Sequence, residues 1–462
     1  MDIALKKSAL VIVTLNSFIT PFMISSVNIA LPAIEKDLHM DAVLLSWIAT
    51  AYLLAVAVAL VPFGRLADIY GRKRIFTCGI ILFTISSILC AASVSTSVLL
   101  FFRALQGIGN AMGFATGMAI LITVYPPQER GKVLGINVAA VYLGLCAGPF
   151  IGGIMTRYFT WRSVFLIPVP IGLLILFLIF RRLKGEWADA RGETFDFTGA
   201  AIYAGTIMGI IFGISLLPAI TSLWVFLAGV ICLIAFIKWE LKVKNPILQI
   251  TLFKTNRVFA FSNLAALISY SATFALSFLL SLYLQYVKAL SPHTAGLVLV
   301  AQPLFMALFS PFAGRISDRI EPRIVATFGM TITFIGLVLM SFVGEKTSLG
   351  YIIGCLILLG SGLAFFSSPN TNAIMSSVEK RFFGIASGTV GTMRTLGMMF
   401  SMGVVTVVFS IFIGRIQITQ EQYPLLIKSI TVAFIVFSLL CFAGIFMSMA
   451  RGKLRADCQR LL

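Results

Sequence analysis

The chain alternates between long apolar runs and short charged segments. A helix needs about 20 apolar residues to cross the hydrocarbon layer of a bilayer. We find fourteen runs of roughly this length and therefore predict an all-α integral membrane protein. The predicted spans lie near residues 10–33, 45–63, 75–94, 98–122, 133–155, 163–180, 197–215, 221–238, 258–284, 294–313, 324–343, 350–373, 384–411 and 427–449.

The charged residues between these runs differ in number from one loop to the next. If the N-terminus is cytoplasmic, most of the 35 lysines and arginines fall on the cytoplasmic side. The opposite side then carries only Lys36, Arg157, Arg162, Lys288, Lys346, Arg415 and Lys428. Such a bias is the positive-inside rule. It predicts that both termini are cytoplasmic, which requires an even number of helices.

One charged segment occurs twice. Residues 64–74 (GRLADIYGRKR) follow the second predicted helix, and a weaker copy at residues 314–323 follows the tenth. A plain duplication of six helices would place the copies six helices apart, but they are eight apart. We infer that two helices are inserted between two six-helix halves, an internal repeat typical of secondary transporters. The predicted domains are residues 1–183, 184–257 and 258–462.

Composition excludes an ordinary soluble protein. Charged residues make up 11% of the chain and hydrophobic residues 59%, whereas a soluble domain has about 25% charged residues. The net charge of +18 does not indicate a nucleic-acid partner, because the cations are confined to short loops between apolar runs. The seven cysteines show no C-x-x-C spacing, so we expect no metal site and no cofactor.

Five stretches resemble motifs of known transporters. Residues 64–74 resemble the signature loop of the major facilitator superfamily, and Arg103–Gly109 resembles its second motif. Residues 144–153 are similar to the motif typical of its exporters. Residues 161–166 and 370–375 are similar to stretches of the fourteen-helix drug–proton antiporter family. The resemblance implies two six-helix bundles plus two inserted helices, in a multidrug efflux transporter that works by alternating access.

The 64–74 segment is the expected gate. Gly64 and Gly71 would allow a tight reversal between helices. Asp68 could pair with an arginine, for which Arg130 in the neighbouring cytoplasmic loop is a candidate. The resemblance implies that the segment latches the cytoplasmic gate; the alternative is that its cations only set the topology. The expected gating residues are Gly64, Asp68, Gly71, Arg72, Arg130 and, in the second copy, Asp318.

The exporter-type stretch has small residues at a spacing of four. Gly144, Gly148 and Gly152 would let two helix backbones approach closely. Pro149 removes a backbone donor and would add a local bend. We expect these four residues to form a hinge; tight helix packing alone is the alternative.

Polar residues inside the predicted helices are candidates for a substrate or coupling cavity. Arg103 is costly inside an apolar helix and should line a cavity or have a partner. It could also extend its guanidinium to the nearby membrane surface. Arg394 is its counterpart in the second half. The full candidate set is Arg103, Gln106, Asn110, Asn137, Tyr142, Asn28, Tyr270, Gln302 and Arg394.

The acidic residues depart from the family pattern. All 17 fall in loops, tails or helix ends, so none lies in the middle of the membrane. In the fourteen-helix family the first helix commonly has an aspartate five residues before the asparagine that matches Asn28, and here that position is Met23. Protons could then couple through Asp68 or another helix-end acid, or the protein could be a uniporter or an exchanger. A cavity with only cations favours neutral or anionic solutes.

We therefore expect a monomeric secondary transporter in the cytoplasmic membrane of a prokaryote. It would export small amphipathic compounds, such as drugs or toxic metabolites, with protons as the expected coupling ion. The alternatives are a uniporter or exchanger of a neutral or anionic metabolite, and a membrane sensor that does not transport. An enzyme is not expected, since the predicted helices hold no acidic pair and the chain has two scattered histidines.

Overall fold

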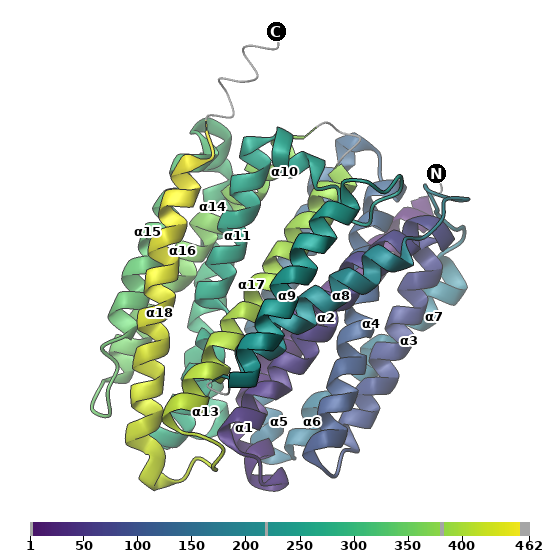
Figure 1. Ribbon diagram of the computed structural model, residues 1–462. Helices are drawn as coiled ribbons and strands as arrows, with labels where there is room; N and C mark the ends of the chain where they lie inside the picture. Colours follow the sequence, from purple (N-terminus) through teal and green to yellow (C-terminus); the bar gives the residue numbers. More distant parts are fainter. Residues whose placement is uncertain (1–2, 218–219, 379–382, 453–462) are drawn as a thin grey trace. The chain divides into compact units, whose positions relative to one another are not determined.

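The computed structural model describes residues 3–217, 220–378 and 383–452, and the regular structure within them is helical (Figure 1). These residues contain 14 helical segments long and apolar enough to cross a membrane, which confirms the predicted number. Two compact units are present. One comprises Met1–Leu248 with Ser291–Gly296, and the other comprises Gln249–Leu290 with Leu297–Leu462.

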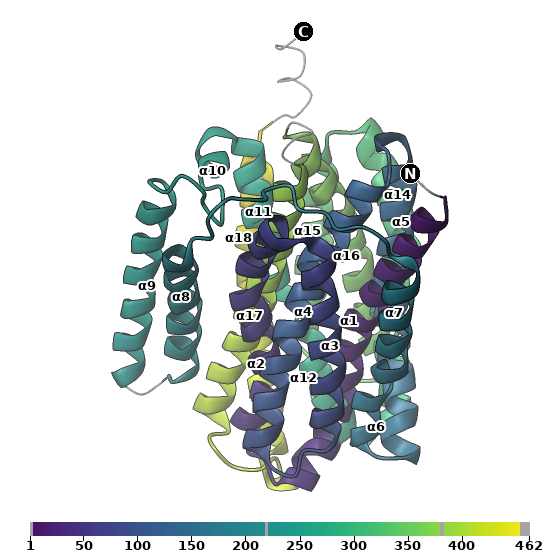
Figure 2. The ribbon, with the colours of Figure 1, turned by 90° about the vertical axis from the view of Figure 1, so that its right-hand side faces the viewer.

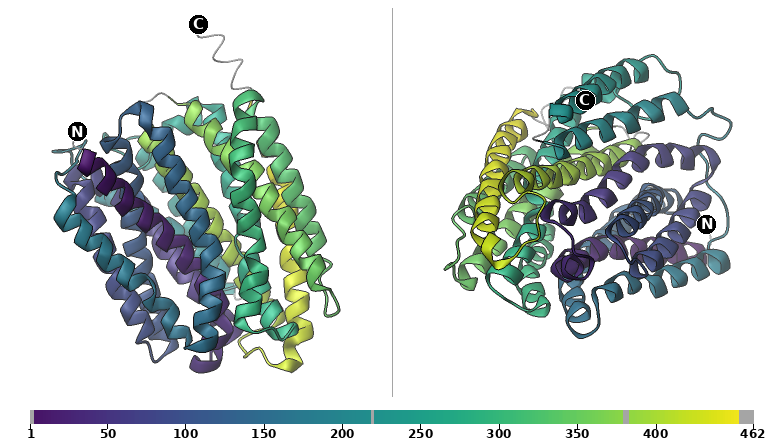
Figure 3. Two further views of the ribbon diagram at one scale, coloured as in Figure 1. Left: turned by 180° about the vertical axis from the view of Figure 1, so that it is seen from behind. Right: turned by 60° about the horizontal axis from the view of Figure 1, so that its bottom comes forward.

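The first unit contains the N-terminal bundle. Its helices are α1 (Ile3–Leu38), α2 (Ala42–Tyr70), α3 (Arg72–Ala91), α4 (Thr96–Val124), α5 (Pro127–Tyr158), α6 (Trp161–Leu166) and α7 (Pro168–Arg182). Helix α1 packs along α5, as the rear view shows, while α4 packs against α2 and α3 (Figure 3). The predicted span 163–180 is two helices, because Pro168 has no backbone N–H to continue the hydrogen-bond ladder from α6.

The inserted helices belong to the same unit. They are α8 (Phe197–Ser215) and α9 (Ile220–Glu240), close to the predicted 197–215 and 221–238. The two helices lie side by side and contact each other at glycines, where Gly209 meets the backbone of Gly229 (Figure 2). Tyr203 Oη on α8 donates a hydrogen bond to the carbonyl of Ala57 on α2, at 3.0 Å. The inserted pair is therefore joined to the N-terminal bundle.

The second unit contains most of the C-terminal bundle. Its helices are α10 (Thr251–Thr255), α11 (Arg257–Thr273), α12 (Leu276–Leu282), the π-helix η1 (Tyr283–Val287), α14 (Ala301–Arg319), α15 (Pro322–Met340), α16 (Leu349–Ser376), α17 (Phe383–Phe412), the 3-10 helix η3 (Gln420–Gln422) and α18 (Tyr423–Ala450). Helix α13 (Pro292–Leu299) is divided between the units. The predicted spans 258–284 and 294–313 are therefore each made of shorter helices placed end to end.

Side chains in the loops fix several helix ends. Asp41 accepts a hydrogen bond from the N–H of Leu44, and Asp196 accepts one from Gly199. Asn256 does the same for Phe259 at the start of α11. Each bond satisfies one N–H that has no partner within its own helix. The starts of α2, α8 and α11 are thus set by local sequence.

Candidate functional site

The 64–74 segment is mostly helix, and the predicted tight reversal is confined to one residue. Helix α2 continues through Gly64 to Tyr70, and α3 begins at Arg72. Gly71 between them has φ +120°, a conformation that L side chains rarely adopt. The expectation for Gly64 was wrong: a Cβ there would meet only Ala115 Cβ at an ordinary 3.7 Å.

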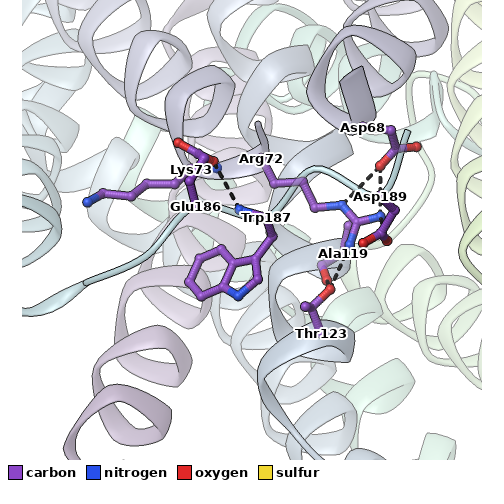
Figure 4. Close-up of polar contacts among 8 residues, drawn as sticks. All are labelled: Asp68, Arg72, Lys73, Ala119, Thr123, Glu186, Trp187 and Asp189. Carbon is purple, nitrogen blue, oxygen red and sulfur yellow. Dashed lines mark hydrogen bonds and ion pairs between the residues drawn. The ribbon is translucent and has the colours of Figure 1, made fainter. Parts of the chain in front are cut away.

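Arg72 is the centre of a polar cluster at this junction. Its Nε and Nη2 donate to Asp68 Oδ1 at 3.0 and 2.7 Å, and its Nη1 donates to Thr123 Oγ1 on α4 at 2.6 Å (Figure 4). The Nη2 atom also lies 2.7 Å from Asp189 Oδ2. The guanidinium thus joins two carboxylates and a hydroxyl from three parts of the chain.

Residues 186–193, which we call the acidic strap, cover this junction. The strap lies in the loop between α7 and α8. Its backbone is tied to the junction twice: Arg72 N donates to the carbonyl of Trp187 at 2.8 Å, and Ala190 N donates to the carbonyl of Asp68 at 2.9 Å (Figure 4 shows Asp68, Arg72 and Trp187). Because backbone bonds add to the side-chain pairs, the strap and the junction form one hydrogen-bonded structure.

Three carboxylates of the strap face the cations of the junction. Glu186 Oε1 accepts from the backbone N–H of Lys73 at 2.8 Å, and Glu186 lies 3.8 Å from Arg74. Glu193 pairs with Arg65, and Asp189 pairs with Arg72. Sequence reasoning missed all three acids. The signal that could have found them is the acidic content of a loop expected on the same membrane side as four cations.

The proposed pairing of Asp68 with Arg130 is not observed. Arg130 Nε donates to the carbonyl of Tyr125 at 3.1 Å, whereas Asp68 accepts hydrogen bonds from Arg72. Arg130 is one turn inside α5, so it is held at the end of α4 by a local contact. Asp318 falls near the end of α14, and its side chain lies outside the described part of the structure.

Arg103 does not lie at an open surface. The residue is 1% exposed, so its guanidinium does not extend to the membrane surface, and it has partners inside the bundle, one of the two expectations for this arginine. Nε donates to the carbonyl of Ile48 on α2 at 3.1 Å, and Nη1 donates to Gln106 Oε1 at 2.5 Å. The guanidinium also lies over the Tyr52 ring, 4.3 Å from its centroid. Arg103 and Gln106 are therefore part of the packed interior that joins α2, α3 and α4.

The other candidates in the N-terminal bundle differ in exposure. Asn110, Asn137 and Asn28 are buried, with 4% to 6% of each side chain exposed. Asn110 Oδ1 accepts from Thr20 Oγ1 at 2.5 Å, which joins α4 to α1. Tyr142 on α5 is half-buried. The three asparagines therefore lie in the interior of the N-terminal bundle. Tyr142 is partly accessible.

Arg394 has a different environment from Arg103. It lies on α17, is half-buried, and its Nη2 donates to Thr371 Oγ1 on α16 at 2.7 Å. Its guanidinium carbon is 5.6 Å from the centroid of the Tyr270 ring on α11. Tyr270 and Gln302 are also half-buried. The structure brings Arg394 and Tyr270 together; it shows no bond between Gln302 and either of them among the described residues.

The three glycines of the exporter-type stretch line the contact of α5 with α1. A Cβ on Gly144 would meet the carbonyl oxygen of Phe18, and one on Gly152 would lie 2.7 Å from Ser26 Cβ. A Cβ on Gly148 would overlap the hydroxyl of Ser25 and lie 2.8 Å from the carbonyl of Phe22. The two backbones thus approach closely, as their spacing predicts. Pro149 lies within α5, which remains one helix.

Known transporters are similar to this chain over most of its length. The riboflavin transporter RibZ of Clostridioides difficile is 33% identical over 429 residues, which cover 93% of this chain and 92% of RibZ. The multidrug resistance protein Stp of Mycobacterium tuberculosis is 30% identical, with 80% and 70% covered. The tetracenomycin C resistance and export protein of Streptomyces glaucescens is 29% identical, with 84% and 73% covered.

The fold is shared with solved transporters. The crystal structure of the peptide transporter POT in complex with sulfate matches with a TM-score of 0.68 and 16% identity, over 94% of each chain. The family model of the Major Facilitator Superfamily matches residues 13–197 and 263–456, which leaves the inserted helices α8 and α9 between the two matched parts. Members of this family are transporters and not enzymes. The chain is a multi-pass membrane protein that belongs to the major facilitator superfamily, in its fourteen-helix group with the multidrug resistance and export proteins.

Proposed function

We propose that this secondary transporter exports small amphipathic compounds across the cytoplasmic membrane by alternating access. The observation that carries the proposal is the contact of α5 with α1, where Gly144, Gly148 and Gly152 leave no room for side chains. Small residues let the two backbones approach closely, and in this proposal the contact is the hinge about which the helices move. Relatives named for drug resistance and for export support the same direction of transport.

The junction of α2 and α3 acts as the gate in this proposal. Alternating access needs a group of contacts that is formed in one state and released in another. The Asp68–Arg72–Asp189 cluster is suited to this because ion pairs at a loop exchange readily with water. With both termini in the cytoplasm, the junction and the acidic strap would lie on the cytoplasmic side and latch that end of the N-terminal bundle.

Proton coupling would use acids at helix ends. Within the described spans, acidic residues occur only near the ends, as for Glu35 and Asp37 at the end of α1. Asp68 near the end of α2 is such an acid, and it is part of the gate cluster. Protonation of Asp68 would remove one carboxylate from Arg72 and so link proton binding to the release of the latch.

A uniporter or exchanger of a neutral or anionic metabolite is the second candidate. The observation that favours it is the similarity to a riboflavin transporter, over 93% of this chain. The same lack of acids in the middle of the spans is compatible with transport that needs no proton.

Counterflow in proteoliposomes tests whether the protein is a carrier at all. Liposomes with the purified protein are loaded with unlabelled tetracenomycin C or riboflavin, and the entry of the labelled compound is followed. We expect transient accumulation of at least one compound above the external concentration. Protein-free liposomes are the control. Binding without counterflow would contradict the proposal and support a sensor.

A further inference from the structure

Two arginines inside the spans, Arg103 and Arg394, differ in how many of their N–H donors have hydrogen-bond acceptors. Arg103 is enclosed, and its guanidinium has a carbonyl, an amide oxygen and two aromatic rings as neighbours. Arg394 is half-buried, and its hydrogen-bond acceptors are the hydroxyls of Thr371 at 2.7 Å and Ser367 at 3.5 Å. Both acceptors are bound through the same atom, Nη2.

The rest of the Arg394 guanidinium has no acceptor among the residues that the structure describes. Its Nε is buried and has no hydrogen-bond partner, and its Nη1 has none among the described residues. No carboxylate in the described part of the chain lies within 4.0 Å of it. A buried donor without an acceptor is costly, and such a site is completed by a ligand, an ion or a water molecule.

The position of Arg394 along α17 makes this more informative. Arg394 lies nine residues, about 14 Å, from the first residue of the described span Ile385–Phe412, so it is well inside the helix and not at its end. The guanidinium therefore lies within an apolar span, where a charged group is costly. An ionisable residue at this depth indicates a functional site, and its missing partner is the feature to explain.

We propose that Arg394, with Tyr270 and Thr371, binds a carboxylate or another oxyanion carried by the transported compound. This inference rests on the proposed function and names the substrate class that its C-terminal bundle recognises. The guanidinium carries a positive charge and offers N–H donors on Nε and Nη1, each of which can donate to an oxygen of an oxyanion. Tyr270 holds the guanidinium plane from one side, and Thr371 fixes its rotation through Nη2. The site thus prefers an acid to the corresponding amide.

The test measures binding of naphthaleneacetate and naphthaleneacetamide to the purified full-length protein. The two probes share one ring system and differ only in carboxylate against carboxamide. Binding is read from the shift of the melting temperature in detergent at millimolar probe concentrations. For the wild type we expect a larger shift with the acid than with the amide.

Two substitutions in the same unit distinguish an effect of the Arg394 site from an effect of losing any one positive charge. Arg394→Gln should abolish the difference between acid and amide, with a loss of acid affinity of about tenfold or more. Arg415→Gln removes a cation from an exposed loop just after α17 and should leave the difference unchanged. If Arg394→Gln does not fold, Arg394→Lys keeps the charge without the planar fork, and it should bind the acid more weakly than the wild type while still preferring it.

Equal binding of the two probes, no binding of either, or a preference for the acid that persists in Arg394→Gln would each overturn the proposal. The assay needs no gradient and no flux, so its outcome is independent of counterflow. Selective binding of the acid without counterflow would support the anion site and contradict the export function. Counterflow of neutral compounds without selective binding of the acid would support a transport function and contradict the anion site.

Discussion

At the scale of single residues, the junction of α2 and α3 depends on Gly71 and Arg72. Gly71 has positive φ, and a Cβ there would overlap the carboxylate of Glu186 in the acidic strap. Arg72 is 11% exposed and has acceptors on α2, on α4 and in the strap. The backbone conformation of Gly71 and the ion pairs of Arg72 thus both hold the α2–α3 junction against the acidic strap.

Replacing Gly71 by Ala should destabilise the protein, while the same change at Gly64 should not. The strained backbone costs about 1–3 kcal/mol, and Glu186 must also move. Gly64→Ala adds a methyl group at ordinary contact distance from Ala115. Thermal unfolding in detergent measures both variants. Equal melting temperatures for the two would show that the strap does not constrain Gly71.

Asp68→Asn should insert normally and lose most of its transport. The amide oxygen of asparagine can still accept from Arg72, but the negative charge that strengthens these bonds is lost, so the latch should weaken and the rate should fall about tenfold or more. Counterflow, normalised to the amount of protein in the membrane, measures the effect. A folded variant with full transport would contradict the role of this cluster as a latch.

Sequence reasoning placed the cations of the gate and Asp68, and it missed the partners in the acidic strap. Gly71 and Asp68 could be predicted because a helix break and a lone acid among cations are local signals. The pairs of Arg72 with Asp189 and of Arg65 with Glu193 could not, since each joins residues more than 100 positions apart. For Arg103, the sequence indicated a polar helix face but could not reveal that Ile48 and Tyr52 enclose it.

At the scale of elements, the close contact of α5 with α1 is the feature that we propose as the hinge. Run lengths predicted both helices, and the small-residue spacing predicted a close approach to another helix, but the sequence did not identify α1 as that helix. The division of predicted spans into α6 with α7, and into α11 with α12, was not predicted. Apolar runs continue through those breaks, so hydropathy alone does not reveal them.

Gly148→Val should impair transport more than it reduces expression. The added side chain overlaps Ser25 and the carbonyl of Phe22 on α1, so it separates the two helices. The matched control is Gly135→Val on the same helix, where no atom lies within 4 Å of an added Cβ. Transport per molecule in proteoliposomes should fall for the first variant only. Comparable losses in both would reject the α1–α5 contact as a hinge.

At the scale of the whole molecule, the expected topology places the α2–α3 junction and the acidic strap in the cytoplasm. Arg74 at the junction and Arg415 after α17 are both exposed and should lie on opposite sides of the membrane. The sequence predicted this from the distribution of cations, since the rule counts charges in loops and needs no tertiary contacts.

Labelling single cysteines tests this topology. In a cysteine-free background, a membrane-impermeant maleimide should label Arg415→Cys in intact cells. Arg74→Cys should react only after the cells are permeabilised. Reaction of Arg74→Cys in intact cells would place the junction outside and reject its role as a cytoplasmic latch.

The central claim is that this chain exports amphipathic compounds by a proton-linked cycle. The most direct test uses proteoliposomes with an imposed pH gradient and follows tetracenomycin C flux and internal pH in the same sample. The account predicts uptake into acidic vesicles with a matching rise of internal pH, and loss of both when an ionophore collapses the gradient. Flux that is unchanged by collapse of the gradient would contradict proton-linked export and favour uniport or exchange.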